Sequence, residues 1–158
     1  MDPHHFIDAS RRLATAQRGK PRQVDLRRAL STAYYGMLHT VSNAYADILI
    51  RTSTVRDHDA WLQAYRSIGH SQLARCCNRK DIISKFSTEM KYFCNTLGYM
   101  HSTRNEADYN PNTTFYRSEV LDDIESARNA INNFMKSELH ERKAYLYMQR
   151  RVQENHNG

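Results

Sequence analysis

The sequence has little of the two residues that shape tight turns. It contains only 5 glycines and 3 prolines in 158 residues. A sandwich or barrel with many tight turns needs more of both, and a phosphate-binding loop needs a glycine-rich run. This scarcity argues against all three and favours a protein built from long helices.

Long apolar runs are also missing. No window approaches the 18 uninterrupted apolar residues of a membrane-spanning helix. The first residues, MDPHHFIDASRR, place acids, histidines and arginines where a signal peptide needs an apolar run. We therefore expect a cytoplasmic protein that has no membrane association.

Cysteine is scarce and unfavourably spaced. The three cysteines, Cys76, Cys77 and Cys94, are an odd number without a CxxC pair, and two adjacent cysteines do not easily form an unstrained disulfide. A zinc site would need a further well-spaced ligand. We expect reduced thiols, no metal and no cofactor.

Positive charge is in excess, and the excess is local. The 23 Lys and Arg against 17 Asp and Glu give a net charge of +6. Residues 1–30 carry seven basic and three acidic side chains, and residues 51–80 carry six and two. Such a balance favours acidic partners, first nucleic acid and then an anionic protein or membrane surface. The alternative is that the charge only keeps the domain soluble.

Apolar residues recur every three to four positions along most of the chain, which predicts amphipathic helices. Asp2 and Pro3 fit the N-cap and first position of the first helix, and Gly36 suggests a close helix crossing. Gly69 is a candidate cap for the end of a short third helix, and Asp81 a candidate N-cap for the fourth.

The segment Thr52 to Asp59 is expected to be turn-like. The later helices are expected at about 24–50, 61–68, 81–109 and 118–152. The fold class predicted is an all-α, antiparallel up-and-down bundle of four or five helices with an extended C-terminal helix.

The C-terminal region contains no breaker. From residue 118 to Val152 there is no proline or glycine, so we expect one helix about 35 residues and roughly 52 Å long. This divides the chain into a bundle at 1–136 and a helical extension at 137–158. Tyr145, Leu146, Met148 and Val152 would then lie on an overhanging arm in need of a partner. A frayed tail is the alternative.

One arginine falls on the apolar side of a predicted helix. The stripe that runs from Ile82 to Met100 reaches Arg104 at the same spacing. A buried guanidinium is costly when unpaired, so Arg104 should have a carboxylate partner or line a wet cleft. Asp108, four residues later, offers an intrahelical ion pair as the structural interpretation.

Three phrases carry a family resemblance. They are LRRALSTAYYGMLHTV at 26–41, WLQAYRSIGHSQLARCC at 61–77 and STRNEADYNP at 102–111. Together they resemble the HEPN superfamily, the small helical domains of prokaryotic toxins, defence systems and CRISPR effectors. The resemblance covers about residues 5–135, and the RNxADYNP phrase is its more specific part.

The resemblance implies a helical bundle that forms a homodimer and places two copies of one motif face to face. In this motif an arginine and a polar residue are followed by about three to five residues of any type and then by a histidine. Active members are metal-independent endoribonucleases, in which a histidine moves the proton of the 2′-hydroxyl or the leaving oxygen. The arginine stabilises the pentacoordinate phosphorus. Arg104 and Asn105 match the start of the motif, but Tyr109, Asn110 and Pro111 stand where its histidine would fall.

Other side chains are candidates to complete the site. His101 lies three residues before Arg104 on one helix face, and Tyr109 can donate a hydrogen bond to phosphate. The predicted catalytic residues are therefore Arg104, Asn105, His101 and Tyr109. The predicted supporting residues are Asp108, Tyr35, His39 and His70. For His39 the alternative is a buried ring bonded to a carbonyl or a tyrosine, and for His70 it is a helix cap.

Two functions from different classes follow. The first is an RNA-directed protein of a toxin–antitoxin or antiviral defence system, with RNA contacts at Arg27, Arg28, Arg66 and Arg75. The second is a catalytically inactive scaffold subunit that acts through a protein partner such as an antitoxin or a larger effector. An exposed Arg104 in a basic cleft favours the first, and an Arg104 sealed by Asp108 favours the second.

Overall fold

The computed structural model describes residues 1–50 and 57–154, with side chains up to Gln149, and every regular element in these ranges is helical. The turn predicted at Thr52 to Asp59 lies mostly outside the described residues. The helices are α1 (Pro3–Thr15), α2 (Gln23–Leu49), α3 (His58–Arg66), α4 (His70–Cys77), α5 (Lys80–Ile83), α6 (Thr88–Tyr109), α7 (Arg117–Lys136) and α8 (Leu139–Glu154).

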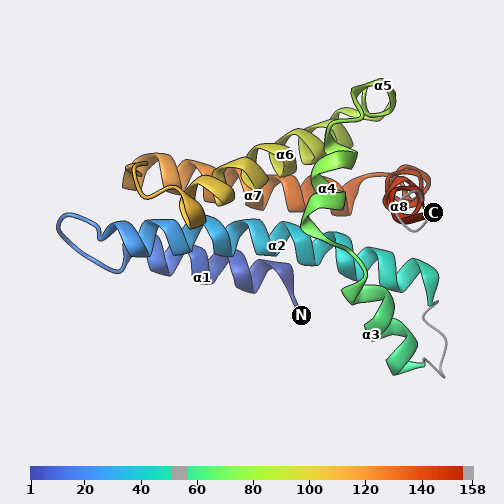
Figure 1. The fold of residues 1–158 in the computed structure, drawn as a ribbon, viewed down its shortest axis with the longest axis horizontal. Coiled ribbons are helices and arrows are strands. Elements are labelled where there is room, and N and C mark those ends of the chain that lie inside the picture. Colours follow the sequence, from blue (N-terminus) through green and yellow to red (C-terminus); the bar gives the residue numbers. More distant parts are fainter. Residues whose placement is uncertain (51–56, 155–158) are drawn as a thin grey trace.

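Four long helices, α1, α2, α6 and α7, form the bundle. Figure 1 shows them side by side, with α1 antiparallel to α2 and α6 antiparallel to α7. Helix α2 contacts the other three, and its buried side chains form the centre of the core. The prediction of an all-α antiparallel bundle is confirmed.

The first helix pair packs closely for a reason visible in the sequence. The Asp2 carboxylate accepts a hydrogen bond from the backbone N–H of His4, which caps the helix that Pro3 begins. A Cβ on Gly36 would lie 3.1 Å from the carbonyl oxygen of Pro3 and 3.2 Å from Cβ of Phe6. Glycine therefore lets α2 approach α1, as expected.

The predicted fourth helix is two helices. The chain leaves helical geometry after Ile83, and the long helix α6 begins only at Thr88. Its N-cap is Ser87 and not Asp81, because the Ser87 hydroxyl accepts from the backbone N–H of Met90. The Glu141 carboxylate, from α8, accepts from both the N–H and the hydroxyl of Ser87, each at 2.6 Å. A partner distant in sequence thus fixes where α6 begins.

The single long C-terminal helix is also wrong. Helix α7 ends at Lys136, and Ser137 is extended, with φ −62° and ψ 155°. Its hydroxyl donates to the carbonyl of Phe134 and is buried, which ends the helix without a glycine or proline. Helix α8 then crosses the end of the bundle, and Figure 1 shows it nearly end-on.

The predicted overhanging arm does not exist, because α8 is part of the core. Tyr145 is 0% and Leu146 2% exposed, and Met148 packs against the same cluster. The Tyr145 ring meets Phe93 and Phe134 edge-on at 6.0 and 6.3 Å between centroids. The side chain of Val152 lies outside the described ones.

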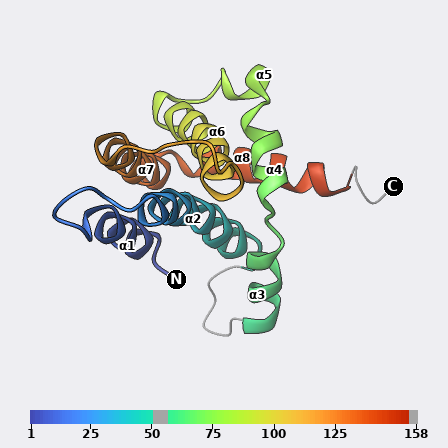
Figure 2. The ribbon, with the colours of Figure 1, turned by 60° about the vertical axis from the view of Figure 1, so that its left-hand side comes forward.

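Short helices cover one side of the bundle. Helix α3 lies beside the C-terminal half of α2, and Figure 2 shows it projecting away from the other helices. Gly69 was expected to cap the end of α3 but is the N-cap of α4, with φ −105°. Helix α4 packs on α6 and α8, which brings His70, its first residue, toward the bundle.

Candidate functional site

Arg104 and Asp108 form an ion pair on α6. Arg104 Nε lies 2.7 Å from Asp108 Oδ2, and the two side chains expose 12% and 18% of their surface. The hydroxyl of Ser31, on α2, donates to the other Asp108 oxygen at 2.6 Å. The carboxylate therefore joins α6 to α2 and fixes the direction of the guanidinium.

The remaining nitrogens of Arg104 reach polar and aromatic neighbours. Nη1 donates to Asn105 Oδ1 at 3.1 Å, and Nη2 donates to the Tyr35 hydroxyl at 3.4 Å. The guanidinium carbon lies 5.9 Å from the ring centroid of Tyr35 and 5.5 Å from that of Tyr109. Burial lowers the pKa of Arg104, but the Tyr35 hydrogen bond and Asp108 outweigh it and raise the pKa, so the group stays charged.

Two histidines from different helices gather near this arginine. The Tyr34 hydroxyl is hydrogen-bonded to His70 Nδ1 at 3.0 Å, and their rings are stacked 5.5 Å apart. The His101 ring meets Tyr34 at 5.8 Å. Tyr35 connects His70 to Arg104, because its ring lies 5.7 Å from the His70 ring and its hydroxyl accepts from Arg104 Nη2.

The electrostatics of this group keep both histidines neutral. Burial lowers the pKa of His70, and the charges of Arg104 and His101 lower it further. Burial and then Arg104 lower the pKa of His101. Burial raises the pKa of Tyr34 well above the usual value for a phenol, so its hydroxyl keeps its proton. At neutral pH each imidazole has one nitrogen that can accept a proton.

Arg104 opens onto a pocket of about 450 Å³. Its lining combines positive charge with two tyrosine rings: Val24, Arg27, Arg28, Tyr35, Arg104, Ala107, Asp108 and Tyr109. Arg28 is exposed, and Tyr109 exposes 73% of its surface at the rim. The histidines are outside this lining, so Tyr35 stands where the pocket and the histidine pair meet.

Arg27 lines the pocket and also stabilises the local fold. Its Nη1 donates to the carbonyls of Ala107 and Asn110 at 2.8 and 2.9 Å, at the end of α6. These carbonyls have no partner within the helix, and a guanidinium satisfies them well. Of the two arginines predicted to contact RNA from α2, Arg28 is the one that faces solvent.

Three predicted residues lie away from this cluster. His39 stacks between Phe6 at 4.5 Å and Tyr65 at 5.6 Å, and it is hydrogen-bonded to the Tyr65 hydroxyl. Burial and the positive N-terminus lower its pKa. His39 therefore matches the alternative interpretation from the sequence, a buried ring that is hydrogen-bonded to a tyrosine. Arg66 ends α3 and Arg75 lies on α4, both exposed and outside the pocket lining.

Two residues of the cluster escaped the sequence analysis. Neither Tyr34 nor Ser31 is among the residues predicted for the site. Both belong to the phrase at 26–41, and Ser31 lies four residues after Arg27 and four before Tyr35 on one side of α2. That spacing was the available signal.

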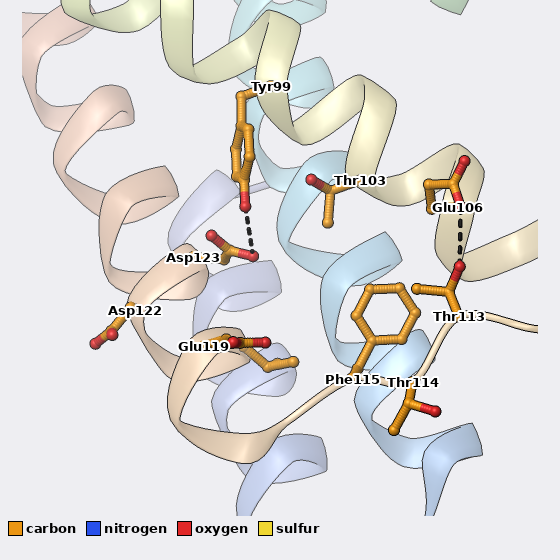
Figure 3. A pocket seen from close by; sticks show the side chains of 10 residues that line it. Tyr99, Thr103, Glu106, Thr113, Thr114, Phe115, Glu119, Asp122 and Asp123 are labelled. Atoms are coloured by element: carbon orange, nitrogen blue, oxygen red, sulfur yellow. Dashed lines mark hydrogen bonds between the residues drawn. The ribbon is translucent and has the colours of Figure 1, made fainter.

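The opposite face of α6 borders a pocket of the other charge. It holds about 560 Å³ between α6 and α7, and four of its lining residues are acidic: Glu106, Glu119, Asp122 and Asp123. Figure 3 shows the Tyr99 hydroxyl, which donates to Asp123 at 3.4 Å, and Thr113, which donates to Glu106 at 2.9 Å. Burial raises the pKa of Asp123. Acidic walls repel phosphate, so an anionic ligand fits only the Arg104 side of the helix.

Comparison of the chain with protein-family models, curated proteins and solved structures gives no match.

Two further classes of site were sought in the described parts of the chain. None of the helices there is long and apolar enough to cross a membrane. Nor do three or more His, Cys, Asp or Glu side chains come together within these ranges in a group that could hold a metal ion.

Proposed function

We propose that this protein is an RNA-directed, HEPN-like protein of a toxin–antitoxin or antiviral defence system, and that the Arg104 cluster cleaves RNA without a metal. One observation carries the proposal. Arg104 and two neutral histidines, contributed by α4 and α6, converge on Tyr34 and Tyr35. A charged arginine beside neutral imidazoles is the set of groups that phosphodiester transfer needs.

In the proposed reaction an imidazole accepts the proton of the 2′-hydroxyl, and the resulting oxygen attacks phosphorus. The bond to the 5′-oxygen breaks, and that oxygen takes up a proton from a protonated imidazole or from water. The products are a 2′,3′-cyclic phosphate and a free 5′-hydroxyl. Arg104 stabilises the negative charge on the phosphorane, while Tyr34 holds His70 in place through Nδ1.

The motif histidine is missing after Arg104, and in this proposal His70 and His101 take its role. His70 lies in the phrase at 61–77 and His101 immediately precedes the phrase at 102–111, and each ring lies close to Tyr34. Tyr109, at the position where the motif histidine would fall, contacts the guanidinium of Arg104 instead. Its exposed ring is available to an RNA base or phosphate.

The test is cleavage of several single-stranded RNAs in EDTA, with the 2′,3′-cyclic phosphate as the diagnostic product. We expect wild-type protein to cleave, and we expect His70→Ala and His101→Ala to cleave at least about tenfold more slowly, because each removes a candidate proton carrier. His140→Ala, at an exposed position on α8, is the matched control. Wild-type protein that cleaves none of the RNAs contradicts the enzyme proposal.

The scaffold function is the second candidate, and the ion pair of Arg104 with Asp108 favours it. An arginine held by a carboxylate, an asparagine and a tyrosine already has partners for three of its nitrogens. RNA binding separates the two candidates. Contacts by Arg28, Arg66 and Arg75 make log affinity fall with log salt by about 0.7 per neutralised phosphate of a single strand. No binding at about 50 mM salt supports the scaffold.

A further inference from the structure

Exposed apolar side chains gather where α8 meets the C-terminal part of α2. Met135 is 57%, Leu139 49%, Tyr147 58% and Leu49 45% exposed. They line two neighbouring pockets of about 370 and 400 Å³, and both pockets share Ile48. We call the surface formed by these five residues the α2–α8 face. Contiguous apolar surface of this kind marks an interaction site.

Helix α8 has two different faces, which explains why this surface stays open. Tyr145 and Leu146 fill the core, so they are unavailable to cover anything outside it. Leu139, Lys143 and Tyr147 follow at steps of four residues on the other face. One stripe of α8 thus belongs to the fold, and the second stripe stays at the surface.

The charge that α8 contributes to this surface is positive. Arg142 lines the first pocket, and the exposed Lys143 lines the second. Arg142 Nε is buried and has no hydrogen-bond partner among the described residues. Asp47, which also lines the first pocket, accepts from the Trp61 indole at 2.8 Å. Two cations beside an apolar groove are complementary to an apolar surface that carries carboxylates.

The acidic side chains of α8 do not offset this charge. Glu141 lies on another side of the helix, where its carboxylate accepts from the N–H and the hydroxyl of Ser87. Glu138, four residues before Arg142, lines neither pocket and leaves Arg142 Nε without a partner. The α2–α8 face therefore keeps its positive edge along α8.

We propose that the α2–α8 face binds an amphipathic helix of a partner protein, with acidic residues beside its apolar stripe. Leu139 lines the first pocket and Tyr147 the second, and they are eight residues apart on α8, or roughly 12 Å. A helix that lies along α8 reaches both pockets with apolar side chains seven residues apart, which is about two turns. Carboxylates on the flank of its apolar stripe then meet Arg142 and Lys143.

This site is separate from the Arg104 pocket. Arg28, at that pocket, and Ile48, at the α2–α8 face, are twenty residues apart on α2, or roughly 30 Å at 1.5 Å per residue. A helix bound to the α2–α8 face therefore leaves the Arg104 pocket open. The proposal does not rest on RNA cleavage, because binding of the helix is measured without RNA.

The test uses two synthetic alanine-based helical peptides as probes. Both carry leucine at positions i, i+4 and i+7, and the stripe is flanked by glutamates in one peptide and by lysines in the other. By fluorescence anisotropy we expect the glutamate peptide to bind with a Kd below about 100 μM, and the lysine peptide to bind at least about tenfold more weakly. Equal binding of the two peptides, or binding of neither, overturns the proposal.

Two substitutions to glutamate locate the site. Leu139→Glu places a charge between the pockets, and Val24→Glu places one at another exposed apolar position, 56% exposed, beside the Arg104 pocket. We expect Leu139→Glu to weaken binding of the glutamate peptide at least about tenfold and Val24→Glu to leave it unchanged. Far-ultraviolet circular dichroism checks that both variants are folded. Loss of binding in a folded Val24→Glu, with binding retained in Leu139→Glu, contradicts the site.

A second pair of variants separates local charge from the net charge of the chain. Lys143→Glu and Lys20→Glu change the net charge equally, but Lys20 lies in the exposed loop between α1 and α2, at the other end of the bundle from α8 (Figure 1). Only Lys143→Glu should reduce the preference for the glutamate peptide. Equal reductions in the two variants contradict the proposed pairing.

The molar mass by light scattering tests the other occupant of this face, a second copy of the chain. We expect the mass to be the same for wild type and Leu139→Glu, because the face is reserved for a partner. A wild-type dimer that Leu139→Glu alone converts to a folded monomer assigns the face to a second copy and overturns the proposal.

Discussion

The two ends of α2 differ in what they do for the molecule. Near its N-terminal end, polar side chains from α2, α4 and α6 interlock around Arg104, and its charge is matched by Asp108. Near its C-terminal end, α8 closes the core with Tyr145 and leaves apolar side chains such as Leu139 outside. The first end gathers charged and polar side chains around one arginine, and the second leaves apolar side chains exposed.

The difference also concerns how each end is stabilised. At the Arg104 end, ion pairs and hydrogen bonds give direction but modest net stability, because each replaces bonds to water. At the α8 end, stability comes from removing large apolar side chains from water. Substitutions at the α8 end should therefore change the free energy of unfolding most, and those at the Arg104 end should change function.

The largest expected effect on stability is at Tyr145. Tyr145→Ala removes a ring that packs against Phe93 and Phe134, and we expect a loss of about 3 to 5 kcal/mol in the free energy of unfolding. Tyr147→Ala, on the exposed face of the same helix, should change it by less than about 0.5 kcal/mol. Urea denaturation measures both. Equal losses from the two substitutions would contradict the packing of α8 in the core.

A smaller effect is expected at Asp108. Asp108→Asn leaves the Arg104 guanidinium without its carboxylate while keeping an oxygen that can accept from Ser31. We expect a loss of about 1 to 3 kcal/mol in the free energy of unfolding. Asp122→Asn, at an exposed position on α7, is the control. A change at Asp108 no larger than at Asp122 would show that the ion pair does not fix the Arg104 end.

The smallest effect concerns pH. Burial lowers the folded-state pKa of His70 and His101, so the unfolded chain binds protons near pH 6.5 more readily than the folded one. Their stabilising contribution is complete above pH 6.5 and is lost as the pH falls below it. Denaturation at pH 7.5 and 5.5 should show lower stability at the acidic value.

The matched variants for this pH dependence are histidine-to-glutamine substitutions. The double variant His70→Gln and His101→Gln should depend less on pH than wild type does, while His140→Gln on the exposed side of α8 should behave like wild type. A double variant with an unchanged pH dependence would contradict burial of the histidine pair.

Periodicity in the sequence predicted the bundle because its long helices bury one continuous stripe each. Asp2, Pro3 and Gly36 act through neighbours that are fixed by local geometry, so their roles were predictable as well. The start of α6 at Ser87 and the end of α7 at Ser137 were missed, because a serine side chain caps a helix only when its hydrogen-bond partner is in place. For Ser87 that partner is Glu141, more than fifty residues away.

The candidate site was predictable to a similar extent. The pairing of Arg104 with Asp108 follows from a spacing of four on one helix. The approach of His70 to Tyr34 depends on how α4 crosses the bundle, which no local pattern encodes. Nearness in the sequence also misled the prediction for His39. This histidine belongs to the same phrase as Tyr35, but it lies away from the Arg104 cluster and stacks on Phe6 and Tyr65.

The most direct test of the Arg104 site is the rate of RNA cleavage and the melting temperature measured on one variant, Arg104→Ala. Removing one donor to a developing oxyanion costs roughly 2.7 to 4 kcal/mol, so we predict a rate at least about a hundredfold lower in a protein that is still folded at the assay temperature. Arg128→Ala, which breaks the surface ion pair with Asp8, controls for the loss of an arginine. A rate that falls only in proportion to the unfolded fraction would contradict a catalytic Arg104 and make its role structural.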